Sequence, residues 1–187
     1  MKINANSVRV GNVIEHQGKL WRVAKTQHTM PGKGGAFVQM ELKEMMSGTK
    51  LNERFRSSED IEKAHLDQRD MQFLYREGEM LTLMDTESYE QTQVNEELLG
   101  DQVVYLQDGM MLMLESHEGK PVGIELPEQV VLEITETEAV VKGQTAANSY
   151  KPAVLENGVR TSVPPFIETG EKVVVKTADG SYVERAK

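Results

Sequence analysis

Short segments that alternate apolar and polar residues, each ending at a glycine-containing turn, dominate the chain. Residues 36–45 show the alternation well, and residues 16–19 form one of the turn sequences. A period of two residues predicts β-strands with one buried face. The best helix candidate is residues 94–106, with Asn95 as its N-cap and Gly100 as its break. We therefore predict an all-β protein with one helix at most.

Two transitions divide the strand segments into three units. The first lies in the polar stretch of residues 57–68, and the second lies at Pro127, where an acidic region gives way to a new strand. Each unit has the size and number of short strands that suit an SH3-like or OB-like barrel. The predicted domains are residues 1–64, 65–128 and 129–187.

Charge is distributed unevenly over these units. The first carries 11 Lys and Arg against 7 Asp and Glu, the second 3 against 15, and the third 7 against 8. The net charges are therefore +4, −12 and −1, within a total of −9. The total argues against a protein that coats nucleic acid uniformly, whereas the basic first unit suggests an anionic partner.

Several classes of protein are excluded by what the sequence lacks. There are no cysteines, so disulfides, thiolate metal sites and a cysteine nucleophile are excluded. No apolar run reaches about 18 residues, and the first residues do not resemble a signal peptide. We expect a cytoplasmic protein that has no membrane partner.

A glycine-rich loop, MPGKGGAF at residues 30–37, joins two predicted strands of the first unit. A phosphate-binding P-loop requires G-x-x-x-x-G-K-[ST], and Gly32 and Lys33 supply its G-K pair. However, Gln27 stands where the first glycine is required, and Gly34 stands where Ser or Thr would bind magnesium. A strand rather than a helix follows, so nucleotide hydrolysis at this loop is excluded.

The same loop is suited to presenting a cation. Its glycines, Gly32, Gly34 and Gly35, permit positive φ, and Pro31 fixes one φ angle at the entrance. Lys33 has no acidic residue within five positions, so its ammonium has no local partner. Such a cation suits contact with phosphate or modification by another enzyme. A plain exposed hairpin lysine is the commoner alternative.

No other constellation indicates catalysis or metal binding. The four histidines form no pair with metal-ligand spacing, and the carboxylates of the second unit lack calcium-loop spacing. We expect no metal, no cofactor and no catalytic residue. A polar loop at residues 142–158 offers side chains for RNA contact, or is an ordinary surface loop.

Motifs in all three units resemble those of one family. They are PGKGGAF at residues 31–37, GTKLNERFRSSE at residues 48–59, FLYREGEMLTLMDTESYEQ at residues 73–91, and the segment from residue 140 to residue 185. Their identity and order resemble bacterial translation elongation factor P, a relative of the eukaryotic initiation factor that carries hypusine. The resemblance runs the whole length of the chain.

This resemblance implies a fold and a function. The fold would be three small β-barrels in an L shape, an SH3-like (KOW-like) barrel followed by two OB-fold barrels. The function would be binding to the ribosome, to its RNA and proteins, between the peptidyl-tRNA and exit sites. There the factor would stimulate peptide bond formation at consecutive prolines, as a monomer and without enzymatic activity of its own.

The resemblance also assigns residues. Lys33 matches a tip lysine that a modifying enzyme alters in many members and that reaches toward the acceptor end of peptidyl-tRNA. Pro31, Gly32, Gly34 and Gly35 would shape its loop. In the third unit Gly143, Gln144 and Thr145 match a loop that faces the messenger, with Gln144 where the family usually has Asp.

Two alternatives differ in class. The first is a generic OB-barrel protein that binds single-stranded RNA, which should present aromatic stacking platforms although aromatic residues are only 5% of this chain. The second is an enzyme that uses the acidic middle unit, for which no residues at catalytic spacing are found.

Overall fold

The first sheet forms a curled, six-stranded barrel. The computed structural model describes residues 1–141 and 149–187. Along one strand of this barrel, Val38, Met40 and Leu42 are fully buried while the residues between them are partly exposed, as alternation predicts. The antiparallel strands follow the order β1-β6-β2-β3-β4-β5. The elements are β1 (Lys2–Asn4), the 3-10 helix η1 (Ala5–Ser7), β2 (Val13–His16), β3 (Lys19–Thr29), β4 (Phe37–Glu44), β5 (Lys50–Arg56) and β6 (Asp60–Ala64).

The second sheet has five strands in the order β11-β10-β7-β8-β9. Its core contains Phe73, Leu81 and Leu83, which are at most 3% exposed. Gly78 and Gly119 lie in the turns between paired strands and both have positive φ, a conformation that suits glycine. The strands are β7 (Asp67–Glu77), β8 (Met80–Asp85), β9 (Gln91–Asn95), β10 (Met111–His117) and β11 (Lys120–Glu125).

The third sheet also has five strands, in the order β14-β13-β12-β15-β16. Ile134, Val173 and Val175 are fully buried in its interior. The strands are β12 (Gln129–Thr137), β13 (Lys151–Leu155), β14 (Arg160–Val163), β15 (Lys172–Lys176) and β16 (Tyr182–Arg185). The all-β prediction is therefore confirmed for the part of the chain that the structure describes.

The predicted helix forms as two short 3-10 helices, η2 (Glu96–Leu98) and η3 (Gly100–Tyr105). Asn95 acts as the predicted N-cap, because its Oδ1 accepts a hydrogen bond from the backbone N–H of Glu97 at 2.9 Å. Gly100 adopts a φ of +56° and interrupts the segment, as predicted. An α-helix was the wrong prediction, since too few residues remain on either side of this break to propagate one.

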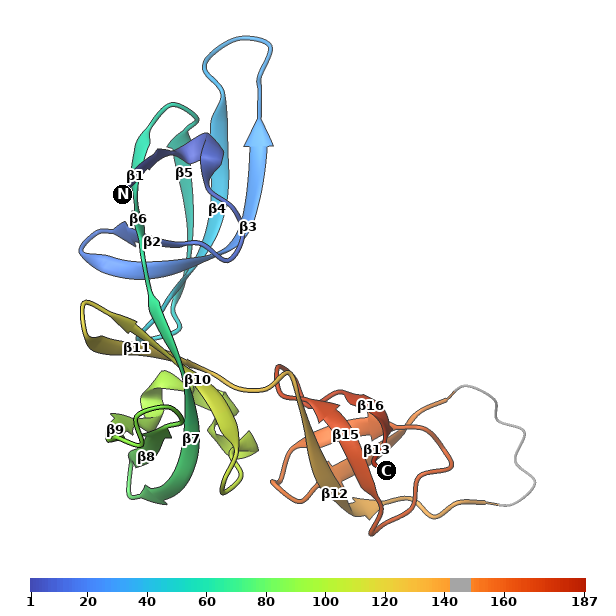
Figure 1. Cartoon of the computed structure of the whole chain (residues 1–187). Helices are drawn as coiled ribbons and strands as arrows, with labels where there is room; N and C mark the ends of the chain where they lie inside the picture. Colours follow the sequence, from blue (N-terminus) through green and yellow to red (C-terminus); the bar gives the residue numbers. More distant parts are fainter. Residues whose placement is uncertain (142–148) are drawn as a thin grey trace. The chain divides into compact units, whose positions relative to one another are not determined.

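Contacts within the chain define two compact units. One comprises Met1–Gly100 with Leu112–Glu125 and contains the first two sheets. The other comprises Asp101–Met111 with Leu126–Lys187 and contains the third sheet. Among the residues described, no helix has the length and apolarity needed to cross a membrane. Within the first unit, the β3–β4 hairpin extends beyond the neighbouring strands and ends in a loop (Figure 1).

Candidate functional site

The loop of residues 30–36 lies at the end of the β3–β4 hairpin. The paired residues Thr29 and Phe37 are the last residues of the ladder on the two strands. At the base of the loop, the backbone N–H of Ser57 donates a hydrogen bond to the carbonyl oxygen of Ala36 at 3.0 Å. Every residue from Met30 to Gly35 is exposed. The loop is therefore held at its base and open to solvent at its end.

Only one glycine of the loop needs its conformational freedom. Gly34 has a φ of +106°, a backbone conformation that L-residues rarely adopt. Gly32 and Gly35 lie outside the positive range, and a Cβ on any of the three would meet no atom within 4 Å. The other two glycines thus keep the loop narrow rather than relieve strain. Pro31 lies at the loop entrance.

Lys33 lies at the centre of this loop with an exposed side chain. In the ranges that the structure describes, it makes no hydrogen bond and no ion pair. The geometric part of the sequence prediction, an exposed and unpaired cation, therefore agrees with the structure. What Lys33 can bind also depends on the side chains that lie beside the loop.

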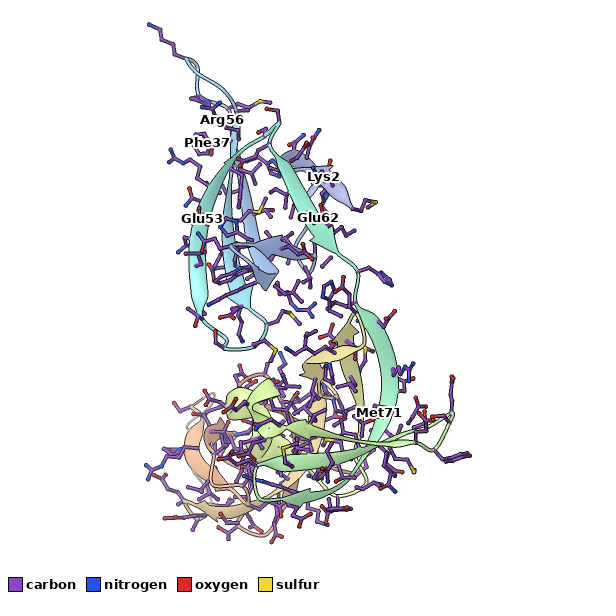
Figure 2. All side chains as sticks on the ribbon, turned by 90° about the vertical axis from the view of Figure 1, so that its left-hand side faces the viewer. Lys2, Phe37, Glu53, Arg56, Glu62 and Met71 are labelled. Carbon is purple, nitrogen blue, oxygen red and sulfur yellow. The ribbon has the colours of Figure 1, made fainter. Side chains whose placement is uncertain are left out.

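A basic face adjoins the loop on β4 and β5. Arg56 lies directly opposite Phe37 in the ladder, and Arg54 lies opposite Gln39, so all four side chains share one face of the sheet. The Arg54 guanidinium lies over the Phe37 ring, 4.2 Å from its centroid. Figure 2 shows Phe37 and Arg56 at the loop end of the sheet. We call Phe37, Arg54 and Arg56 the basic face.

The sequence interpretation missed the basic face. Neither guanidinium pairs with a carboxylate within residues 1–141 and 149–187, although the backbone N–H of Arg56 donates a hydrogen bond to Oε2 of Glu59 at 3.1 Å. The signal was present in the segment LNERFR, where two arginines two residues apart must lie on one face of a strand. Placing them beside the loop required the register between β4 and β5, which the sequence does not state.

The second predicted RNA-facing element falls outside the described residues. Gly143, Gln144 and Thr145 belong to residues 142–148, which lie between β12 and β13. Beyond this segment, Tyr150 is 58% exposed and contacts Tyr182 edge to face, with ring centroids 6.3 Å apart. The sequence analysis included Tyr150 in a loop that offers side chains for RNA contact, but it did not predict the contact with the partly buried Tyr182.

Two other titratable groups, Asp85 and His16, make contacts within their own barrels. Asp85 accepts hydrogen bonds from the backbone N–H groups of Glu87 and Ser88, at 2.8 and 3.2 Å, and these bonds lower the pKa of its carboxyl group. His16 contacts the Phe55 ring edge to face. No group of three or more His, Cys, Asp or Glu side chains suited to a metal ion occurs among the described residues.

Comparison with protein-family models finds three matches in chain order. The description "Elongation factor P (EF-P) KOW-like domain" matches residues 4–61, "Elongation factor P (EF-P) OB domain" matches residues 66–124, and "Elongation factor P, C-terminal" matches residues 130–185. The first match contains the Lys33 loop and the basic face. The three sheets therefore correspond to an SH3-like (KOW-like) barrel followed by an OB barrel and the family's C-terminal barrel.

Two curated relatives match over their full lengths. Elongation factor P of Parvibaculum lavamentivorans is 61% identical over 186 residues, and elongation factor P of Brucella abortus is 58% identical over 186 residues. In both cases the match covers 100% of this chain and 100% of the relative. A solved structure described as eukaryotic translation initiation factor 5A from Methanococcus jannaschii shares the fold. It has a TM-score of 0.55 and 22% identity, and the match covers 65% of this chain and 90% of that one. On the full-length identities and the three ordered domain matches, the chain belongs to the elongation factor P family of translation factors.

Proposed function

We propose that this protein binds the ribosome between the peptidyl-tRNA and exit sites and stimulates peptide bond formation at consecutive prolines. The observation that supports this most directly is Lys33, an exposed and unpaired cation on a narrow loop at the end of a long hairpin. A narrow loop can enter a crowded RNA site, and an ammonium suits the phosphates found there. Membership of the elongation factor P family gives the setting.

The mechanism depends on orientation rather than on acid–base chemistry. The proline ring fixes φ, so a nascent chain that ends in prolines explores few conformations and aligns poorly for reaction. Lys33 and its loop hold the acceptor end of peptidyl-tRNA in a reactive geometry, while the ribosome supplies the catalytic centre. Correct orientation of reacting groups accounts for several kcal/mol of a barrier. No residue of this chain is assigned a catalytic role.

Two other surfaces, the basic face and the loop at residues 143–145, make the remaining contacts with RNA. The basic face beside the loop binds phosphates of the tRNA, because its two guanidiniums have no anionic partner in the described part of the chain. Gly143, Gln144 and Thr145 face the messenger, and the amide of Gln144 both donates and accepts hydrogen bonds there. We retain residues 1–64, 65–128 and 129–187 as the three domains that bring these contacts together.

Modification of Lys33 by a dedicated enzyme belongs to the same proposal. The ammonium lies free in solvent, so an enzyme can reach it without unfolding the barrel. Intact-mass and peptide mass spectrometry of the protein purified from its native cells measures the added group directly. An unmodified Lys33 in fully active protein contradicts this part of the proposal.

The test of the function is translation through three consecutive prolines in a reconstituted system. We expect Lys33→Ala to lower the maximal stimulation about ten- to hundredfold, because misplacement of reacting groups by ångströms has effects of this size. Lys120→Ala is the matched control, since Lys120 is an exposed lysine beside a hairpin turn of another barrel. Equal stimulation by the Lys33→Ala variant and the unsubstituted protein contradicts the proposal.

The second candidate function is general binding of single-stranded RNA. The exposed Tyr150 and its contact with Tyr182 favour it, because aromatic rings on an OB barrel stack on bases without sequence preference. Filter binding to free single-stranded RNA separates the two functions. The ribosomal factor binds such RNA weakly, whereas the general binder retains tight binding in the absence of ribosomes.

A further inference from the structure

The N-terminal barrel, which carries Lys33, is joined to the central barrel by very little chain. Strand β6 ends at Ala64 and β7 begins at Asp67, so only His65 and Leu66 lie between the two barrels. A single short link of this kind does not fix the orientation of one barrel relative to the other. Relative motion of domains is the default unless their interface prevents it. The direction of the Lys33 loop therefore depends on noncovalent contacts between the barrels.

The central contact is an ion pair between Arg22 on β3 and Glu115 on β10. Nη2 of Arg22 donates hydrogen bonds to both carboxylate oxygens of Glu115, each at 2.8 Å. The Glu115 side chain is 6% exposed and that of Arg22 is 38% exposed. Among the ion pairs of the described residues, this one has the least exposed carboxylate, and burial reduces screening of the pair by salt.

Each partner of this pair depends on the opposite barrel for its counter-charge. Among the described residues of its own barrel, the Glu115 carboxylate accepts one long hydrogen bond, from the Gln68 amide at 3.5 Å. Arg22 donates to the Gly11 carbonyl oxygen of its own barrel at 3.3 Å. No other ion pair of either side chain is found in residues 1–141 and 149–187. The pair thus links the barrels rather than stabilising one of them.

A register shift at Glu115 and a glycine opposite it make room for the ion pair. The β10–β11 ladder shifts register between Glu115 and Ser116, and a bulge of this kind redirects the neighbouring side chain. Opposite Glu115 lies Gly123. A Cβ at Gly123 would lie 3.2 Å from Oε1 of Glu115 and 3.1 Å from Cε of Met45 in the N-terminal barrel. Glycine therefore leaves the space in which the two barrels approach each other.

A weaker contact lies near the first. Nε2 of His117 lies 3.7 Å from Oε1 of Glu15, and again one residue comes from each barrel. Two of the contacts between the barrels are therefore ion pairs, whose strength depends on charge and geometry. Because few directed contacts hold the two barrels in one orientation, the loss of one contact should change that orientation strongly.

We propose that Arg22 and Glu115 are positioning residues that fix the direction in which the N-terminal barrel presents Lys33, an inference that rests on the proposed function of that lysine. When the pair is intact, one orientation of the barrel dominates. When the pair is broken, the N-terminal barrel adopts several orientations relative to the central barrel. Only a fraction of the molecules can then place the Lys33 loop at its binding site. The apparent affinity for the ribosome then falls by that fraction, while correctly bound molecules remain fully active.

The first measurement concerns orientation alone. The chain has no cysteine, so Asn52→Cys on β5 and Gln93→Cys on β9 give unique, exposed spin-label sites in the two barrels. Double electron–electron resonance should give a narrow distance distribution for the labelled protein and a broad one for Glu115→Gln or Gly123→Ala. Arg76→Ala is the matched control, because its ion pair with Glu96 lies within the central barrel. An unchanged distribution in Glu115→Gln overturns the proposal.

The second measurement concerns function, through a double-mutant cycle in polyproline translation. We expect Arg22→Ala and Glu115→Gln each to raise the half-saturating factor concentration about three- to tenfold and to leave the maximal rate unchanged. The double variant should be no worse than either single variant, because one interaction is lost in all three. Arg22→Lys, which retains the charge, should restore part of the affinity.

The outcomes separate this inference from the proposed function. Additive effects of Arg22→Ala and Glu115→Gln, or a fall in maximal rate alone, overturn the positioning role. Lys33→Ala should instead lower the maximal rate, and if it does not, the role of the lysine is wrong. The resonance measurement still decides in that case whether the pair fixes the barrels. Circular dichroism melting of each variant confirms that both barrels remain folded.

Discussion

Substitution of Gly180 by alanine tests how closely the segment Asp101–Met111 packs within the second compact unit. It lies in the turn between β15 and β16 with a φ of +75°. A Cβ there would lie 2.7 Å from Oη of Tyr105 and 3.0 Å from Cγ1 of Val159. Tyr105 belongs to η3 and is only 5% exposed, so its ring cannot easily move aside. Gly180→Ala should therefore strain both the turn and its packing.

The size of the effect follows from two contributions. The left-handed backbone costs an alanine about 1–2 kcal/mol, and an overpacked contact costs about 1–3 kcal/mol more. Gly158 is the matched control, because it has a φ of +84° in the turn between β13 and β14 and no atom within 4 Å of a Cβ. We expect Gly158→Ala to lose only the backbone contribution, so the two variants should differ by about 1–3 kcal/mol.

Hydrogen exchange measures this difference locally. The amide of Gly180 donates to the Lys176 carbonyl oxygen at 2.7 Å, and exchange of the β15 and β16 amides gives their opening free energy. Adding Tyr105→Phe to Gly180→Ala removes the closest atom, so the double variant should recover part of the loss. Equal destabilisation by Gly158→Ala and Gly180→Ala, or no recovery with phenylalanine, refutes the packing argument.

Two further predictions concern charge. Arg54→Ala and Arg56→Ala should each weaken ribosome binding and lower the slope of log affinity against log salt by about 0.7–0.9, one phosphate contact each, whereas the exposed Arg69→Ala should leave the slope unchanged. The pKa of Tyr105 is raised above 10.0, chiefly by burial and then by the charge of Asp179. The folded state thus holds this proton more tightly than the unfolded state, so its stabilisation is complete below about pH 10 and declines as the pH rises further. Urea unfolding of Tyr105→Phe at increasing pH should show a shallower decline, and an identical decline contradicts the assignment.

The sequence predicted the parts of this molecule that depend on local pattern. Alternation located the strands, and the lack of an acid near Lys33 anticipated its unpaired ammonium. Asn95 and Gly100 were identified correctly as cap and break, although the segment between them is too short for an α-helix. These features depend on residues only a few positions apart, for which the chemistry of the segment is sufficient.

Contacts between distant residues were not predicted. Arg22 and Glu115 lie 93 positions apart, and nothing in either segment indicates the other. Arg54 and Arg56 are candidate binding residues because they lie beside the Lys33 loop. That position depends on the register between β4 and β5. Charged residues on strands are usually solvated, so a charge pattern alone does not separate a binding surface from an ordinary one.

Bulges explain why alternation alone cannot assign every face. Trp21 and Val23 are buried on β3, and strict alternation would bury Lys25 as well. The register shift between Val23 and Lys25 turns that lysine outward, where it is 79% exposed and lies 3.7 Å from a Glu41 carboxylate oxygen. On β7, a shift after the buried Phe73 leaves Tyr75 48% exposed.

The same reasoning applies to the pair that joins the barrels. Arg22 precedes the shift on β3, and Glu115 lies at the shift on β10. A bulge adds one residue to a strand and redirects its neighbours, yet it leaves no distinctive residue type behind. Side chains beside bulges are therefore those whose direction sequence parity predicts least well. Glu115 is one such residue, whereas Arg22 alternates normally with the buried Trp21 and Val23. Their role emerges only from the folded backbone, because it depends on a contact between residues 93 positions apart.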